Sequence, residues 1–128
     1  MVVAGAVGGN AVWAAFPCGS AWACQDLWEH YAFTLDEKYL RDVWPTLRGA
    51  AEFFLDFLIE DPKTGYLVTA PDTNFENSHS RGGGLSMGPT PSSMMVRQLF
   101  KNWPDDTGDW GSKCEVCDTF IPYSQHVV

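Results

Sequence analysis

Residues 47–59, LRGAAEFFLDFLI, decide the fold of this chain. Their apolar positions recur at steps of three and four, which is the spacing that lines one face of an α-helix. The stripe consists of Leu47, Ala50, Ala51, Phe54, Leu55 and Leu58. At about 1.5 Å per residue, a helix from Leu47 to Ile59 would be about 20 Å long. The turn-forming run DPKTG at 61–65 follows and is expected to end it.

Two further helical segments are expected before this stretch. Residues 21–33 carry apolar side chains at i, i+3, i+4 and i+7, and Ser20 precedes them as a candidate N-cap; the apolar set is Cys24, Leu27, Trp28 and Tyr31. Asp36 can cap a short segment that Pro45 interrupts. Pro45 fits the first turn of the next helix, where its missing N–H costs nothing.

The pattern after the central stretch is more varied. Residues 66–69, YLVT, predict a short strand. A long polar and glycine-rich loop follows between Pro71 and Pro89, and a last helix is expected to start at Ser92 or Ser93 and to include Phe100. Helices joined by short connections predict a mainly α chain built of antiparallel helix pairs.

Composition excludes several classes of function. The 128 residues include 8 Lys and Arg against 16 Asp and Glu, a net charge of −8, so binding to nucleic acid or to an anionic membrane is not expected. No apolar run approaches the roughly 18 residues that a membrane helix needs. The N-terminus has no basic residue before its apolar stretch, so we predict no signal peptide, and the compartment stays open.

The cysteines and the motif inventory indicate no cofactor. Cys24 falls on the apolar face of its helix, where a buried free thiol is expected. Cys114 and Cys117 form a single C-x-x-C, and no second pair is present to complete a zinc site, so we predict no metal; their role stays open. The chain also lacks nucleotide-binding and flavin-binding glycine motifs.

Several ordered motifs carry a resemblance to a known family. They are AWACQDLWEHY at 21–31, GAAEFFLDFL at 49–58, DPKTGYLVT at 61–69, GPT at 88–90 and RQLF at 97–100. In this order they resemble the catalytic domain of glycoside hydrolase family 95, the α-L-fucosidases built on an (α/α)6 barrel of six helical hairpins. The resemblance divides the chain into a partial catalytic domain at 12–102 and a divergent tail at 103–128.

The size of such a barrel bears on this chain. Twelve helices with their connections need about 200 residues or more, so the chain would be a fragment holding an incomplete barrel. The remainder of the barrel is then an expected partner. The apolar stripe at 47–58 would lack its packing partners and leave the isolated chain prone to association.

The resemblance also implies a catalytic residue. The family has Ser-Pro-Ser-x-Ser-Pro-Glu-Asn after its Leu-Val-Thr, and its glutamate is the general acid; here APDTNFEN at 70–77 occupies that place and aligns Glu76 with the acid. A carboxyl can protonate a glycosidic oxygen near neutral pH if its pKa is raised. Asp72 replaces a serine of the family pattern, and it either raises the pKa of this acid or lies in solvent.

Substrate contacts are expected from four more residues. Asn74, Asn77 and His79 can hydrogen-bond sugar hydroxyls, or they can satisfy the local backbone. Trp13 can cover the apolar face of a sugar, or it can pack in the core. Trp22 and Phe53 are expected to be packing residues.

The family implies hydrolysis of terminal α-fucosidic linkages with inversion, on a fucosylated oligosaccharide or glycan. Inversion requires a water activated on the face opposite the acid. The resemblance places the asparagines and the aspartate that hold this water outside the matched segment, so the isolated chain is expected to be inactive. Two alternatives stay open, namely an inactive remnant that binds sugar or protein, and a six-hairpin glycosidase of another specificity.

Overall fold

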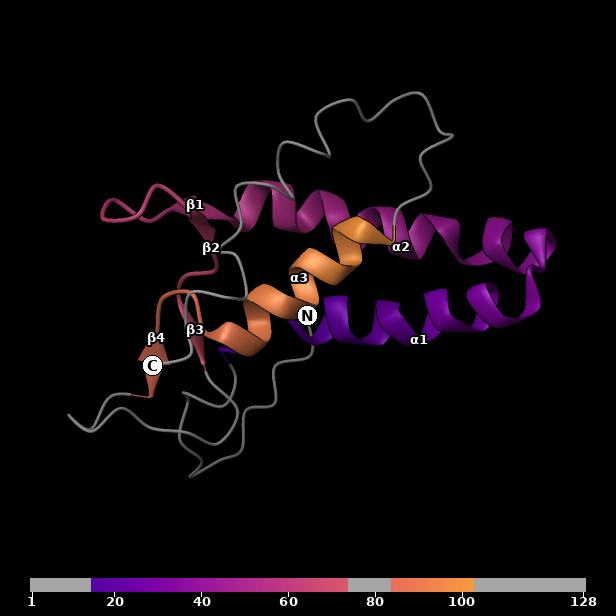
Figure 1. Ribbon diagram of the computed structural model, residues 1–128, viewed down its shortest axis with the longest axis horizontal. Helices are drawn as coiled ribbons and strands as arrows, with labels where there is room; N and C mark the ends of the chain where they lie inside the picture. The colour runs from indigo at the N-terminus through magenta and orange to yellow at the C-terminus, as the bar shows by residue number, and fades with distance from the viewer. Residues whose placement is uncertain (1–14, 74–83, 103–128) are drawn as a thin grey trace.

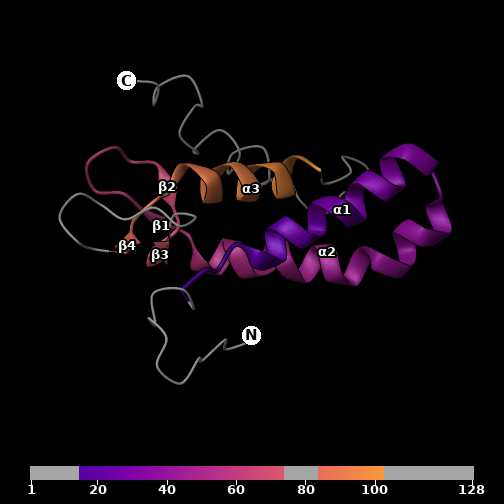
Figure 2. The same cartoon turned by 90° about the horizontal axis from the view of Figure 1, so that it is seen from below.

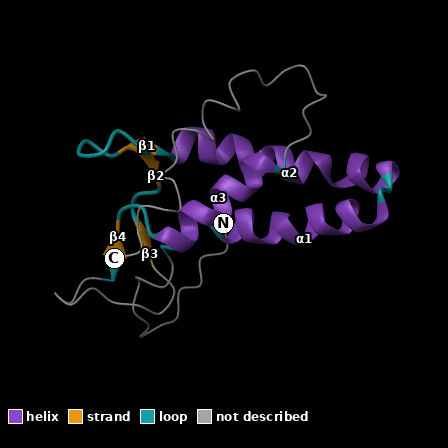
Figure 3. Ribbon diagram, viewed as in Figure 1, coloured by secondary structure: helices purple, strands orange, loops and turns teal. Residues whose placement is uncertain are grey.

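The computed structural model describes residues 15–73 and 84–102. This part of the chain contains α1 (Gly19–Thr34), α2 (Glu37–Phe57), α3 (Thr90–Lys101) and four two-residue strands, β1 (Ile59–Glu60), β2 (Leu67–Val68), β3 (Asp72–Thr73) and β4 (Leu85–Ser86). Helices dominate, with the strands gathered at one end (Figure 3). The predicted mainly α class of helical hairpins is confirmed.

Two of the three helices form a hairpin, and the third lies across it. α1 and α2 run antiparallel along the long axis, and α3 covers the half of this hairpin that is nearer to the strands (Figure 1). Seen from below, α3 lies on one side of both (Figure 2). The other end of the hairpin, where Leu35 joins the two helices in a left-handed conformation at φ 54°, extends beyond α3.

α2 differs from the prediction of two separate segments. It is one helix of 21 residues with Pro45 inside it, not in a first turn. The proline removes one backbone hydrogen bond, to the carbonyl of Arg41. However, the apolar spacing continues across it, because Leu40 and Val43 pack on the same core as Leu47. Packing of this continuous stripe on α1 keeps both halves in one helix.

The helix ends agree with the sequence in part. Asp36 caps α2 as predicted, since its side-chain Oδ1 accepts hydrogen bonds from the backbone N–H of Lys38 at 2.9 Å and of Tyr39 at 3.0 Å. The predicted Ser20 cap is wrong. α1 starts earlier, with Cys18 at the N-cap position and without a side-chain capping bond, so Ser20 lies inside the first turn.

The strands form two small antiparallel ladders. β1 pairs with β2 across the 61–66 turn, which confirms the strand predicted within residues 66–69. Because Ile59 belongs to β1, α2 ends at Phe57 and not at Ile59 as expected. β3 pairs with β4. α3 begins at Thr90, earlier than predicted, because Pro91 suits the first turn of a helix.

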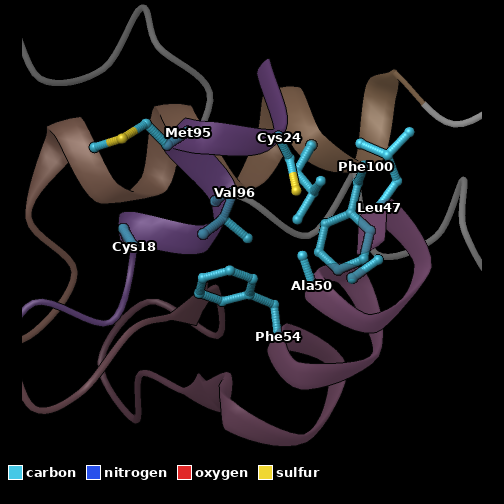
Figure 4. Packing of buried hydrophobic residues seen from close by; sticks show 11 residues of the cluster. Cys18, Cys24, Leu47, Ala50, Phe54, Met95, Val96 and Phe100 are labelled. Atoms are coloured by element: carbon cyan, nitrogen blue, oxygen red, sulfur yellow. The ribbon is translucent and has the colours of Figure 1, made fainter. Parts of the chain in front are cut away.

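The core lies where the three helices meet. Figure 4 shows the Phe54 ring pointing from α2 toward Val96 of α3; both side chains are fully buried. The cluster comprises Cys18, Ala21, Cys24, Leu47, Ala50, Ala51, Phe54, Met95, Val96, Leu99 and Phe100. Most of the α2 stripe therefore has partners within the chain, contrary to our expectation, whereas Leu55, predicted to lie on the stripe, is 37% exposed. Cys24 is a buried free thiol, as predicted.

Two aromatic residues expected to pack are about half exposed. Trp22 is 53% exposed and Phe53 is 44% exposed, because each lies beside the buried stripe of its helix and not on it. Phe53 stacks on Phe57 at 5.2 Å between ring centroids, so its ring is sheltered on one side. No helix in the described part is long and apolar enough to span a membrane.

Candidate functional site

The predicted site residues fall on segments next to the described part. Trp13, Asn74, Glu76, Asn77 and His79 all lie outside the described residues, and their roles remain predictions. The structure does place the residues that flank them. Those flanks decide where the candidate site is attached to the fold.

The segment that carries Glu76 is flanked by one strand ladder. β3 leads into it and β4 follows it, with Asp72 paired to Ser86 and Thr73 paired to Leu85. The hydroxyl of Ser86 also donates to the carbonyl oxygen of Asp72 at 3.4 Å. The two flanks of the 74–83 segment are therefore held side by side, beside the first turn of α3 (Figure 1).

A buried polar group anchors this ladder, and we call it the Asp72 cluster: Cys18, Thr69, Asp72 and Ser92. All four residues are 0–1% exposed. Asp72 Oδ2 accepts a hydrogen bond from the Thr69 hydroxyl at 2.6 Å and a weak one from the Cys18 thiol at 3.8 Å. Asp72 Oδ1 accepts from the backbone N–H of Thr73 at 2.7 Å. Asp72 thus lies in the interior, and the solvent alternative is wrong.

Cys18 is a hydrogen-bond donor in this cluster. Burial raises the pKa of its thiol to about 12. The Ser92 hydroxyl lowers this pKa, and the negative charge of Asp72 raises it. The Ser92 hydroxyl lies beside the sulfur without hydrogen-bond geometry, and it has no hydrogen-bond partner among the described residues. A thiol that stays protonated at neutral pH is a poor nucleophile, so its contribution is structural.

A glycine lies where the segment after β4 packs closely against β2. Gly88 adopts φ +61°, and its N–H donates to the carbonyl of Thr69 at 2.9 Å. A Cβ at this position would lie 2.9 Å from Cγ1 of Val68. Both the backbone conformation and the close approach require glycine here.

The cluster joins parts of the chain that are distant in sequence. Cys18 comes shortly after Trp13, and Asp72 comes shortly before Glu76, so the structure brings together the flanks of two predicted site segments. Sequence reasoning missed Cys18, Thr69 and Ser92. The available signal was the Thr-x-x-Asp spacing of Thr69 and Asp72, but that spacing is equally usual in a solvent-exposed turn.

The described part offers no metal site, since no three His, Cys, Asp or Glu side chains converge within 15–73 and 84–102. The two cysteines of the C-x-x-C, Cys114 and Cys117, lie outside those ranges, and their role stays open. What the described geometry does supply is a paired two-strand attachment for the segment that carries Glu76.

The family follows from the sequence match over nearly the whole chain. The profile of the glycosyl hydrolase family 95 catalytic domain matches residues 2–121. The chain belongs to glycosyl hydrolase family 95. The resemblance inferred from the motifs is thereby confirmed, and the helical hairpins are consistent with part of the family's helical barrel.

Two relatives of this family 95 chain carry fucosidase names. Alpha-L-fucosidase 2 from Arabidopsis thaliana is 41% identical over 94 residues, which are 73% of this chain and 11% of that protein. Probable alpha-fucosidase A from Aspergillus niger is 33% identical over 96 residues, which are 70% of this chain and 12% of that protein. The chain therefore spans about a tenth of the length of the curated relatives that it matches.

Proposed function

We propose that this family 95 chain takes part in α-L-fucosidase-type hydrolysis of terminal α-fucosidic linkages, with Glu76 as the general acid. The observation that carries the proposal is the family match, joined to two relatives with fucosidase names. The ladder of β3 and β4 adds support, because it holds both flanks of the Glu76 segment. The substrate class is a fucosylated oligosaccharide or glycan.

The proposed chemistry divides between Glu76 and a water molecule. The Glu76 carboxyl donates its proton to the glycosidic oxygen while the bond to the fucose C1 breaks. An inverting reaction needs a water on the opposite face, activated by a group about 6.5–9.5 Å from the acid. The resemblance assigns that group to positions outside residues 12–100, so the proposal includes the remainder of the barrel as a partner. Asn74, Asn77, His79 and Trp13 are proposed to contact the sugar.

The test compares Glu76→Gln with a matched control, Glu29→Gln, which changes an exposed glutamate on α1. The variants are made in a lengthened protein that includes the remainder of the barrel. Fucose release from a fucosylated oligosaccharide is measured by NMR, which also reports the anomer formed first. We expect Glu76→Gln to lower the rate by about 10²–10⁴-fold and Glu29→Gln to leave it unchanged. Inversion predicts β-fucose as the first product.

A substrate with a better leaving group sharpens this test. Fluoride departs without needing a proton, so α-fucosyl fluoride should largely restore turnover by Glu76→Gln. Full activity of that variant on the oligosaccharide would contradict the role of Glu76. Binding of fucose without turnover by the unmodified lengthened protein would contradict hydrolysis and favour the sugar-binding alternative.

A further inference from the structure

We propose that Asp72 is a positioning residue, whose two carboxylate oxygens fix the strand from which the Glu76 segment leaves the fold. This inference rests on the proposed function only for its catalytic consequence. Its structural part concerns described residues alone. Asp72 is itself 0% exposed and accepts hydrogen bonds from its neighbours Thr69 and Thr73 and, weakly, from the distant Cys18.

The carboxylate uses its two oxygens in two directions. Oδ2 accepts the Thr69 hydroxyl at 2.6 Å and faces the Cys18 thiol at the start of α1, whereas Oδ1 accepts the Thr73 N–H at 2.7 Å. Charged acceptors make the shorter and stronger hydrogen bonds in proteins. The two short bonds fix the local path of the backbone into β3, and the weak bond from the Cys18 thiol at 3.8 Å adds a contact with the residue that precedes α1.

Chain connectivity transmits this constraint toward Glu76. Glu76 is four residues after Asp72, so even a fully extended chain allows about 14 Å between their Cα atoms. A catalytic acid has to be held within a fraction of an ångström of its productive position. Loosening the strand that begins this short connection should therefore reduce the productive fraction of the acid.

The chain supplies a control aspartate in the turn between β1 and β2. Asp61 Oδ2 accepts the Thr64 hydroxyl at 2.6 Å, the same distance as in the Thr69–Asp72 pair, and Asp61 Oδ1 accepts the Lys63 N–H at 3.1 Å. Asp61 organises only the turn between β1 and β2 and lies at the surface. Asp61→Asn thus removes an equivalent aspartate without touching β3.

The first measurement is hydrogen exchange of the backbone amides in the full chain. Asp72→Asn keeps the side-chain volume but leaves one acceptor oxygen where two are needed, so we expect amides of residues 69–73 and 84–88 to exchange at least tenfold faster. The Cys18 thiol should also react at least tenfold faster with a thiol reagent. Asp61→Asn should leave both readouts unchanged. Protection equal to that of the unmodified chain in Asp72→Asn would overturn the proposal, because packing alone would then suffice.

The second measurement is the kinetic consequence. Corrected for the folded fraction, Asp72→Asn should lower kcat at least tenfold while KM changes less than twofold, because the acid and not sugar binding is affected. Equal loss in kcat with Asp61→Asn would overturn the positioning role. This kinetic comparison uses the lengthened protein that includes the remainder of the barrel. If that protein shows no turnover, the proposed function fails, whereas the exchange and thiol data still decide the structural role of Asp72.

Discussion

At the scale of single residues, the burial of Asp72 and the burial of Cys18 are compensated in two different ways. Asp72 is buried with hydrogen bonds from Thr69 and Thr73, so its removal from water is compensated. Cys18 is compensated differently, since a thiol has little hydration to lose as long as it keeps its proton. Stability is therefore linked to the protonation of this thiol.

Alkaline pH should expose this linkage. The pKa of Cys18 is about 12 in the folded chain and 9.0 as its ordinary value, so between these values the unfolded chain releases the proton while the folded chain keeps it. The free energy of unfolding should then fall as pH rises above about 9, by at most about 1.4 kcal/mol per pH unit from this group. Urea unfolding at pH about 8 to 10.5, followed by circular dichroism, measures the slope.

Cys18→Ala provides the control for that measurement. It removes the titrating group while all other residues titrate as before, so its stability should fall less steeply with pH than that of the unmodified chain. Parallel pH dependences of the two proteins would contradict the assigned pKa.

Residue-level prediction from sequence succeeded where one side chain and the adjacent backbone decide the structure. Asp36 is an example, because capping needs only an oxygen two or three residues before free N–H groups. It failed for Ser20, which has the same capping chemistry but lies after a helix start set by packing of Cys18 and Ala21. The burial of Asp72 depends on contacts with α1, which no local pattern contains.

At the scale of elements, α2 shows packing overriding a local signal. Pro45 predicts an interruption, but the apolar residues on both of its sides pack on one core and keep the helix continuous. The helix also carries three exposed i, i+4 ion pairs, which stabilise it only slightly because solvent screens them. Its continuity therefore depends mainly on the buried stripe.

Replacing the proline should consequently stabilise the protein. Pro45→Ala restores a backbone donor for the Arg41 carbonyl; a proline in a helix interior costs about 3 kcal/mol relative to alanine, and its restriction of the unfolded chain offsets up to about 1 kcal/mol of this. We expect the free energy of unfolding to rise by about 2 kcal/mol in urea titrations. A decrease would show instead that packing of α2 on α1 needs the bend that proline introduces.

At the scale of the whole molecule, the three described helices pack together around one apolar core. We expected the α2 stripe to lack partners, and α1 and α3 supply them. The mainly α class and the family could be predicted because periodicity and ordered motifs extend through most of the chain. The site could be predicted only as residue identities, because the placement of its flanks depends on long-range contacts such as Cys18 with Asp72.

A pair of neighbouring substitutions tests how far this core stabilises the chain. Phe54 is 0% exposed and Leu55 is 37% exposed, although they are adjacent in α2. Phe54→Ala should cost about 3–5 kcal/mol, and Leu55→Ala about 1 kcal/mol or less. Thermal unfolding followed by circular dichroism compares them. Equal costs would mean that the outer face of α2 is also covered, as it would be by an associated partner.

The order of the helices along the chain has a consequence for biosynthesis. The α1–α2 hairpin is joined by a single short turn and leaves the ribosome well before α3, whose first residue is Thr90. Until α3 is made, the face of Phe54 that packs on Val96 has no cover. A nascent chain with such a face is a natural client for chaperones that bind exposed apolar surface during translation.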